Sequence, residues 1–275
     1  MTTKKIQPGK IIMGIVMIGV SVMVLYPLIW LIISSFKLER EIVQFPPSLW
    51  PSALTVEHYI RVWDVLPLFR LFMNTIFFSS AVTIANVLLA AMAGYAFARI
   101  KFKGRDTMFK TLLLTMMVPF HVIMIPLYIL IHSLGMLDTF AGLIIPRLTW
   151  PFAIYLMRAF FVALPKNLEE AGRIDGASEY RIFWSVMLPL CKPALITIGV
   201  MTFVNNWNDL LYPLLVTNSS NMRTLAAGLA MFVGLRIIEY GPTLAAAMIS
   251  LIPLFVIFIF LQKYFVRGTV ISGMK

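Results

Sequence analysis

Residues 165–189 read PKNLEEAGRIDGASEYRIFWSVMLP and form a polar island between two long apolar segments. Because the island carries eight ionisable side chains, it cannot lie in hydrocarbon and must face water. Those side chains belong to Lys166, Glu169, Glu170, Arg173, Asp175, Glu179, Tyr180 and Arg181. In a chain otherwise dominated by apolar runs, such a segment is typical of an element that contacts another protein in the water phase.

The order of residues in the island predicts a short helix, a glycine turn and a second helix. Leu168 and Ala171 give the first helix a narrow apolar stripe. Asp175 and Gly176 then supply a left-handed stop, and Ser178 can cap the helix that follows. We therefore expect a rigid helical hairpin, which is what a docking element requires.

Composition places the rest of the chain in a membrane. Of the 275 residues, 60% are hydrophobic and only 13% are charged, whereas a soluble domain has about 25% charged residues. About 20 apolar residues are needed to cross a hydrocarbon core of ~30 Å. Six segments meet this length: 11–35, 71–98, 109–131, 141–163, 188–206 and 243–265. We predict an all-α polytopic membrane protein, with one transmembrane domain over residues 1–275 and a cytoplasmic loop at 164–187.

The positive residues predict the orientation of these spans. If the N-terminus lies inside, the inner segments carry 16 of the 23 Lys and Arg residues. These inner segments are 1–10, 99–110, 158–192 and 263–275. The bias predicts that both termini are cytoplasmic. It also explains the net charge of +11 without a nucleic-acid partner. The first apolar run has the basic start of a signal peptide, but it is too long and lacks a cleavage pattern, so we expect it to be retained.

The polar island resembles the signature loop of ABC importer permeases. In that loop Glu-Ala-Ala is followed by three residues, Gly, nine residues and Ile-x-Leu-Pro. The residues that fall on the pattern are Glu170, Ala171, Gly172, Gly176, Val186, Leu188 and Pro189. Two of them depart from it, since a glycine replaces the second alanine and a valine replaces the isoleucine. The sequence around the loop is similar to that of carbohydrate-importer permeases of the maltose-transporter type.

This resemblance implies a type I ABC importer in a prokaryotic cytoplasmic membrane. A second permease subunit would complete the pathway, and an extracytoplasmic sugar-binding protein would deliver the cargo. Two ATPase subunits would bind ATP and Mg²⁺, so no cofactor is expected in this chain. By analogy the short helix docks on an ATPase, with Glu170 as a polar contact and Gly172 allowing close approach. The expected coupling residues are Leu168, Glu169, Glu170, Ala171, Gly172, Arg173, Asp175 and Gly176.

Catalytic motifs are missing from the sequence. It contains no G-x-x-x-x-G-K-[ST] phosphate loop, no H-E-x-x-H and no G-x-S-x-G elbow. The three histidines are scattered, which predicts no metal site, and the single cysteine, Cys191, excludes an intrachain disulfide. We therefore expect a transport subunit without an ATPase site, which draws energy from a partner.

Polar residues end the fifth expected span, where the sequence reads Asn205-Asn206-Trp207-Asn208-Asp209. Amides and a carboxylate are costly in hydrocarbon and usually face a polar interior. Sugars are bound by the same groups, with an aromatic ring stacked on the apolar sugar face. A solvated helix end with ordinary caps is the alternative. The expected substrate-path residues are Asn205, Asn206, Trp207 and Asp209, with Tyr128 and Tyr155 as further candidates.

Other functions remain open from the sequence. The cargo of an importer could also be a polyol, glycerol phosphate or a polyamine. A phosphate would favour a basic residue inside the spans, and Arg147 alone lies well away from the inner edge, so a neutral sugar is preferred. A stand-alone channel would not need the docking loop. An intramembrane enzyme would need paired carboxylates or a Ser/His arrangement, and the spans contain almost no acidic residue.

Overall fold

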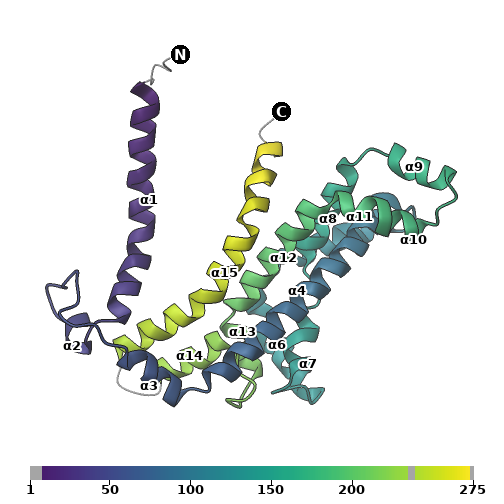
Figure 1. The fold of residues 1–275 in the computed structure, drawn as a ribbon. Coiled ribbons are helices and arrows are strands. Elements are labelled where there is room, and N and C mark those ends of the chain that lie inside the picture. The colour runs from purple at the N-terminus through teal and green to yellow at the C-terminus, as the bar shows by residue number, and fades with distance from the viewer. Residues whose placement is uncertain (1–7, 235–238, 273–275) are drawn as a thin grey trace. The chain divides into compact units, whose positions relative to one another are not determined.

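The computed structural model describes residues 8–234 and 239–272, and every regular element in these ranges is helical. The all-α prediction is therefore confirmed. The chain forms two compact units (Figure 1). The first is Met1–Leu66 with Met231–Ile252, and the second is Pro67–Ala230 with Pro253–Lys275. The predicted inner ends at residues 1–7 and 273–275 lie outside the described residues.

The first unit begins with α1 (Pro8–Ser35), which matches the first predicted span. The most apolar stretch of Ile12–Ser35 has no residue buried against the described part of the chain, as expected for a helix that faces lipid or another subunit. Two short helices follow, α2 (Glu39–Ile42) and α3 (Glu57–Val65). The first part of α15 (Tyr240–Ser272) completes this unit.

Polar contacts order the segment that follows α1. Lys37 is fully buried, and its ammonium donates a 2.5 Å hydrogen bond to the carbonyl of Ser48. The same ammonium lies 4.2 Å from the ring centroid of Trp30, a cation–π contact. The buried carboxylate of Glu41 accepts hydrogen bonds from the backbone and the hydroxyl of Ser52. This stretch between the first two predicted spans is therefore folded onto itself.

The start of α15 is fixed to α2 and α3 by charge. The carboxylate of Glu39 accepts hydrogen bonds from the backbone N–H groups of Tyr240 and Gly241, at 2.7 and 2.8 Å. A carboxylate at a helix N-terminus satisfies orphan donors and complements the helix dipole. Arg61 of α3 adds an ion pair with Glu239, with Nε 2.6 Å from the carboxylate.

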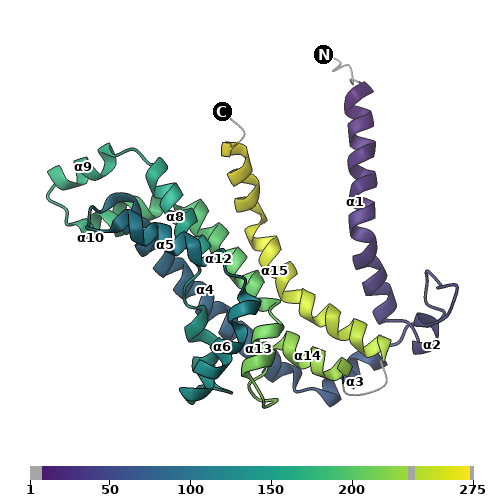
Figure 2. The same ribbon diagram turned by 180° about the vertical axis from the view of Figure 1, so that it is seen from behind.

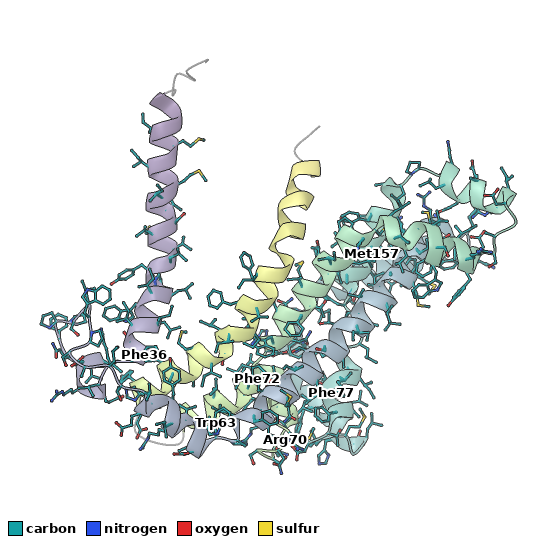
Figure 3. All side chains as sticks on the ribbon, in the orientation of Figure 1. Phe36, Trp63, Arg70, Phe72, Phe77 and Met157 are labelled. Carbon is teal, nitrogen blue, oxygen red and sulfur yellow. The ribbon has the colours of Figure 1, made fainter. Side chains whose placement is uncertain are left out.

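The second unit is built on α4 (Leu68–Arg99), the second predicted span. Two helices pack along it, α8 (Pro151–Ala163) and α12 (Lys192–Trp207). The shorter elements are α5 (Arg105–Thr115), α6 (Phe120–Ser133), α7 (Phe140–Ile144), the 3-10 helix η1 (Ile145–Arg147), α13 (Leu211–Val216) and α14 (Leu225–Gly234). Figure 3 labels Phe77 on α4, whose ring packs edge-on against Phe140 of α7 with centroids 4.7 Å apart.

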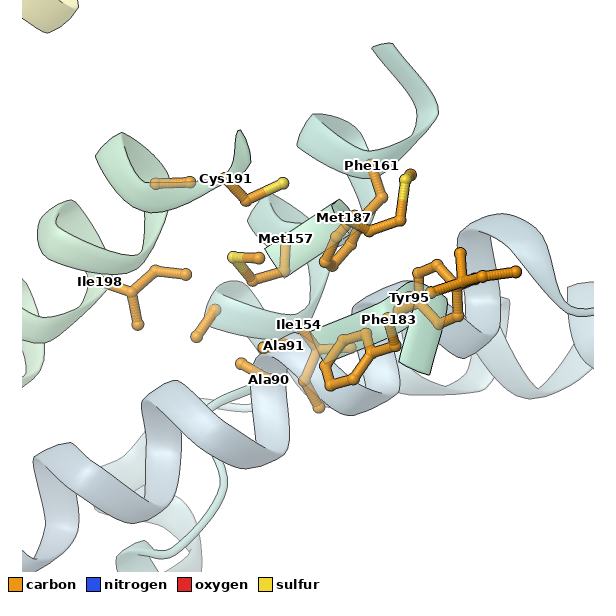
Figure 4. Packing of buried hydrophobic residues seen from close by; sticks show 13 residues of the cluster. Ala90, Ala91, Tyr95, Ile154, Met157, Phe161, Phe183, Met187, Cys191 and Ile198 are labelled. Atoms are coloured by element: carbon orange, nitrogen blue, oxygen red, sulfur yellow. The ribbon is translucent and has the colours of Figure 1, made fainter. Parts of the chain in front are cut away.

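A tight core joins α4 to α8 and to the π-helix η2 (Phe183–Met187) (Figure 4). Its labelled members are Ala90, Ala91, Tyr95, Ile154, Met157, Phe161, Phe183, Met187, Cys191 and Ile198. Gly94 lies at the α4–α8 contact, where a Cβ would stand 2.6 Å from Cβ of Met157 and 2.9 Å from the backbone nitrogen of Arg158. The absence of a side chain at Gly94 therefore lets the two backbones approach each other.

Three of the predicted spans are bent. The third divides into α5 and α6 at an angle of 97°, and the fourth divides at 41° between η1 and α8. The fifth turns by 77° before α12. Proline explains the first two breaks, since Pro119 and Pro151 stand at the starts of α6 and α8 and cannot continue the helix before them.

The number of spans remains a prediction. Among the described residues, α1 and α4 contain helices long and apolar enough to cross a membrane, and the three bent pairs would raise the number to five. The sixth predicted span, 243–265, falls in α15, where Tyr240–Val256 is a shorter apolar helix.

Candidate docking helix and substrate cavity

The polar island folds as a helical hairpin, as its sequence predicts. The first helix is α9 (Asn167–Ile174) and the second starts with α10 (Glu179–Ile182). Gly176 has a φ of 75°, the left-handed conformation expected for the stop. The hydroxyl of Ser178 accepts a hydrogen bond from the backbone N–H of Arg181 at 3.3 Å, so the predicted cap is confirmed. Figures 1 and 2 show α9 at one end of the second unit, beyond the ends of α8 and α10.

One face of α9 is exposed and carries both charge and apolar surface. Glu170 and Ala171 are exposed, and Leu168 and Ile174 are 36% and 86% exposed. Exposed apolar side chains beside charged ones are typical of a protein interaction surface. Glu169, predicted as a coupling residue, lies on the opposite side and is buried. Its carboxylate is therefore placed to hold α9 to the rest of the chain.

Arg99, at the end of α4, binds Glu169. The two side chains form an ion pair with Nε 3.2 Å from Oε1, and each is only 6% exposed. The same guanidinium donates hydrogen bonds to the carbonyls of Phe161, at 2.6 Å, and Leu164, both at the C-terminal end of α8. Arginine suits this role because its planar fork can reach several acceptors at once.

The hairpin is closed by a second, exposed ion pair. Arg173 Nε lies 2.6 Å from the carboxylate of Glu179, and a contact of 3.8 Å joins Arg173 to Glu169. The hydrogen bond from Arg173 lowers the pKa of Glu179 from its ordinary value, chiefly because it stabilises the charged form. The turn between the two helices is thus held by charge as well as by Gly176.

Gly172 makes its close approach inside the chain. A Cβ at this position would lie 3.1 Å from Cγ1 of Ile182 in α10, tighter than an ordinary contact. The glycine that replaces the second alanine of the permease pattern therefore lets α9 and α10 pack together. We expected this residue to allow contact with an ATPase, and the structure gives it a role in the hairpin itself.

A polar cavity of about 100 Å³ lies within the second unit, between α4, the break before α8, and α12. Its lining residues are Val82, Asn86, Arg147, Thr149, Trp150, Thr202, Asn205 and Asn206. Two predicted substrate-path residues, Asn205 and Asn206, are therefore brought together here. The break at Trp150 admits polar groups because the chain leaves its helical conformation at this point.

Several polar atoms around the cavity have no hydrogen-bond partner among the described residues. The amide nitrogen of Asn86 donates to the carbonyls of Val82, at 3.0 Å, and Arg147, at 2.8 Å, so its oxygen is left over. The hydroxyl of Thr202 and Nε of Arg147 are likewise unpaired within this part of the chain. These three groups belong to residues that line the cavity, and an acceptor, a hydroxyl and a donor are a set that matches a hydroxyl-bearing ligand or water.

Asp209 serves as the counterion of Arg147. The guanidinium of Arg147 bonds to this carboxylate and lies between two rings, 4.5 Å from the centroid of Phe120 and 4.6 Å from that of Tyr212. The other oxygen of Asp209 accepts from the backbone N–H of Tyr212 at 3.3 Å. The positive charge at the cavity is therefore neutralised within the chain, and Asp209 does not line the cavity directly.

Comparison with known proteins gives the family. Residues 86–271 match the family described as binding-protein-dependent transport system inner membrane components. The chain belongs to this family. The resemblance found in the polar island is thereby confirmed, as is the expectation of a transport subunit rather than an enzyme.

Relatives of this permease cover nearly its whole length. The arabinooligosaccharides transport system permease protein AraQ of Halalkalibacterium halodurans is 35% identical over 91% of this chain and 91% of its own. The diacetylchitobiose uptake system permease protein NgcG of Streptomyces coelicolor is 30% identical over 92% of this chain and 84% of its own. The sn-glycerol-3-phosphate transport system permease protein UgpE of Yersinia pestis is 31% identical over 93% of each chain.

A solved structure has the same fold as this permease. It is a bacterial ABC transporter involved in the import of the acidic polysaccharide alginate, with a TM-score of 0.81 and 26% identity. The similarity covers 96% of this permease and all of that chain.

The remaining predicted path residues of the permease lie away from the cavity. Trp207 is 3% exposed and packs against the rings of Phe72 and Phe203, each with centroids 5.6 Å away. Tyr128 lies beside His132 on α6. Tyr155 stacks on Phe109, with ring planes 17° apart. The indole at the cavity is that of Trp150, which the sequence reading did not select.

Sequence reasoning also missed Asn86, Thr202 and Arg99 of the permease. Each is a polar residue within or at the end of an apolar run, which is a signal that the sequence contains. The sequence does not say which of several such residues face one another, since that depends on how α4 packs on α8 and α12.

Proposed function

We propose that this permease is one of two membrane subunits of an ATP-driven sugar importer in a prokaryotic cytoplasmic membrane. A second permease subunit would complete the pathway, and two ATP-binding subunits would bind ATP and Mg²⁺. An extracytoplasmic binding protein would deliver the sugar. The observation that carries the proposal is that one chain holds an exposed, charged helix, α9, at the predicted docking loop and a cavity lined by polar residues in its helical core.

The exposed face of α9 supports the coupling role. Leu168, Ala171 and Ile174 give it apolar area, and Glu170 gives it a charge that a basic side chain on an ATPase would bind. With both termini inside, as the positive residues predict, α9 faces the cytoplasm, where ATP is hydrolysed. ATP-driven closure of the ATPase pair would then displace α9 and, with it, the helices that surround the cavity.

The chemistry of the cavity supports a hydroxyl-rich cargo. Amides, a hydroxyl and an indole are the groups that proteins use for sugars. Pockets for small ligands usually have about 300–1,000 Å³, so a cavity of about 100 Å³ holds only part of a sugar unit. A second permease subunit facing this cavity would supply the rest of the site. Two of the relatives are named for oligosaccharide uptake, which agrees with this cargo.

An anionic cargo is the second candidate. Arg147 lines the cavity, one relative is named for glycerol 3-phosphate, and the similar structure is involved in alginate import. The Asp209 carboxylate weighs against it, since it already neutralises the guanidinium. A neutral sugar therefore fits the charge of the site better than a phosphate or a uronate does.

Co-purification followed by uptake tests the proposal. The tagged chain is purified from membranes in mild detergent and its partners are identified by mass spectrometry. The complex is then placed in liposomes with its binding protein, and uptake of an arabinooligosaccharide, diacetylchitobiose and glycerol 3-phosphate is compared with and without ATP. We expect an ATPase and a second permease in the eluate, and ATP-dependent uptake of a neutral saccharide.

Each other outcome has a clear meaning. A chain that purifies alone, stably and without an ATPase, would overturn the coupling role and favour a channel. ATP-dependent uptake of glycerol 3-phosphate alone would overturn the neutral cargo while leaving the importer intact.

A further inference from the structure

The docking helix is joined to the rest of the permease through a buried ion pair. Arg99 and Glu169 are each 6% exposed, in a segment where most charged side chains lie in water. The neighbouring pair between Arg173 and Glu179 shows the contrast, with exposures of 46% and 53%. Exposed ion pairs contribute little, whereas opening a buried pair leaves an uncompensated charge. Separation of α9 from α4 is therefore resisted at Arg99.

Arg99 connects three elements at one point. Its guanidinium meets the carboxylate of Glu169 on α9 and the carbonyls of Phe161 and Leu164 at the end of α8. Both carbonyls lie in or just after the last turn of α8, where helical donors run out, and that of Phe161 also accepts a hydrogen bond from the backbone N–H of Leu164 at 3.2 Å. Residues 164–166, which connect α8 to α9, are therefore flanked on both sides by contacts to the side chain of Arg99.

The same helix, α4, reaches the cavity. Asn86 lines the cavity and Arg99 holds α9, and both belong to α4. Thirteen residues separate them, which corresponds to about 20 Å along a helix. Between them, Gly94 lets α4 pack directly against the backbone of α8, with no flexible side chain in between. A displacement of α9 would therefore be carried to the cavity by a packed helix rather than by a loop.

We propose that Arg99 and Glu169 are positioning residues that lock the docking helix to α4, so that the two move as one body when an ATPase pushes on α9. The inference rests on the proposed docking role of α9. Glu170 and the apolar face make the contact with the ATPase, and Arg99 with Glu169 converts that contact into movement at the cavity. Loss of the lock would leave docking and ATP hydrolysis in place and reduce transport.

Distance measurements between spin labels test the lock directly. Labels are attached at Lys166→Cys, the exposed N-cap of α9, which is outside the proposed docking face, and at Met92→Cys on α4, which is 51% exposed. Cys191, the buried native cysteine, is replaced by alanine. The distance between the labels is measured in the complex with its ATPase, without nucleotide and with ATP trapped. We expect one narrow distribution that is the same in both states.

Glu169→Gln removes the charge and keeps the shape of the side chain. We expect it to broaden the distance distribution by about a factor of two. Transport per ATP hydrolysed should fall by roughly tenfold, because small errors in the placement of functional groups are costly. The amount of ATPase that co-purifies should not change. Arg99→Gln should do the same, and Arg99→Lys should recover part of the effect because it keeps the charge.

Arg105→Gln is the matched control. Arg105 also lies at the inner end of the helices, but its partner, Asp106, is 71% exposed and the pair does not touch α9. This variant should behave like the wild type. If Arg99→Gln does not accumulate in membranes, Glu169→Gln decides the question alone.

Two results would overturn the lock. One is a narrow distribution with normal coupling in Glu169→Gln. The other is loss of the ATPase from that variant, which would make Glu169 part of the docking surface. If the wild type brings down no ATPase, the proposed function fails, and the label distances in the isolated chain still show whether α9 and α4 are locked.

Discussion

Gly94 is a position where a single methyl group should destabilise the permease. A Cβ there would meet the Cβ of Met157 and the backbone of Arg158, and backbone atoms cannot turn away as a flexible side chain can. We expect Gly94→Ala to lower stability by about 1–3 kcal/mol, the usual cost of overpacking. Thermal unfolding in detergent measures the change.

Gly199→Ala is the matched control for that experiment. A Cβ at Gly199 of α12 would sit 3.7 Å from Val87 and 3.9 Å from Thr83, both ordinary contacts. Alanine is the better helix former by up to about 1 kcal/mol, so this variant should be as stable as the wild type or more so. Equal melting temperatures for the two variants would contradict the close approach of α4 and α8.

Thr202 separates a role in cargo binding from a role in folding. Its buried hydroxyl has no partner among the residues that the structure describes and lines the cavity, so Thr202→Val should leave stability unchanged or raise it slightly. Uptake should weaken, with an apparent KM higher by roughly tenfold, about the effect of one lost hydrogen bond of 1–1.5 kcal/mol. Saturation curves for uptake measure this change.

Thr75→Val provides the contrast. The hydroxyl of Thr75 accepts from the backbone N–H of Leu225 at 2.7 Å and donates to the carbonyl of Leu71 at 2.7 Å. Its removal should cost about 1–3 kcal/mol of stability, because a buried N–H is left unpaired, with no effect on KM in the protein that survives. A normal KM in Thr202→Val would remove that hydroxyl from the proposed site.

The sequence predicts part of the candidate site, namely the residues that form a local pattern. Asn205 and Asn206 were found because amides stand together at the end of an apolar run, which is a local pattern. Asn86 meets them only through the packing of α4 on α12, and Arg99 meets Glu169 only through the packing of α4 on α8. Contacts between segments far apart in the chain leave no local pattern, so these residues were missed.

At the scale of elements, the turn between α9 and α10 should tolerate asparagine and reject valine at Gly176. The residue has a φ of 75°, which asparagine adopts readily and a β-branched residue does not. We expect Gly176→Val to destabilise the hairpin by about 1–2 kcal/mol and to reduce uptake at normal membrane abundance. Gly176→Asn should keep most of the uptake.

The comparison between the two Gly176 variants isolates backbone conformation. Both add a side chain to an open position, where a Cβ would meet nothing within 4 Å. Equal uptake by both would mean that the left-handed turn does not matter for coupling.

The stability of the segment between α1 and α3 should depend on pH. Hydrogen bonds from the side chain and backbone of Ser52 lower the pKa of Glu41 from its ordinary value of 4.5. A lowered pKa means that the charged form is favoured by folding, so the contribution is present above 4.5 and is lost as pH falls through the lower, folded value. Acid should therefore loosen residues 39–56.

Hydrogen exchange of this segment at neutral pH and below pH 4.5 measures that effect. Because the intrinsic exchange rate of amides falls in acid, protection factors are compared, and those of this segment should be lower at the acid pH in the wild type. Glu41→Gln should show a smaller dependence on pH, since no carboxylate is left to protonate. An equal loss of protection in both proteins would assign the acid effect to another group.

The sequence predicts the position of a helix where hydropathy or turn residues determine it. The first two spans and the α9–α10 hairpin agree with their predicted positions because long apolar runs, a left-handed glycine and a serine cap act locally. Hydropathy does not report bends, so it does not predict the 97° turn before α6, although Pro119 lies inside the predicted span. A proline in a membrane helix permits a bend, and packing decides whether it forms.

At the scale of the whole molecule, substitutions of two neighbouring glutamates should impair transport in different ways. Glu170 is exposed on α9, whereas Glu169 is buried against Arg99. Glu170→Lys reverses the charge offered to the ATPase, so we expect the ATPase to be lost from the purified complex and uptake to fall by about 10-fold or more. Glu170→Gln, which keeps the shape, should fall between Glu170→Lys and the wild type.

Glu169→Gln should instead keep the ATPase and hydrolyse ATP without matching transport. Pull-downs and the ratio of sugar imported to ATP hydrolysed, measured for both variants in liposomes, distinguish the two failures. Membrane abundance should be normal for Glu170→Lys, because this side chain is exposed, and both readouts of Glu169→Gln are normalised to the amount of permease in the liposomes. If both variants lose the ATPase equally, α9 docks with both faces and the division between a contact residue and a positioning residue is wrong. If neither does, α9 is not the surface through which the ATPase acts, and the coupling must run through another cytoplasmic segment of the permease.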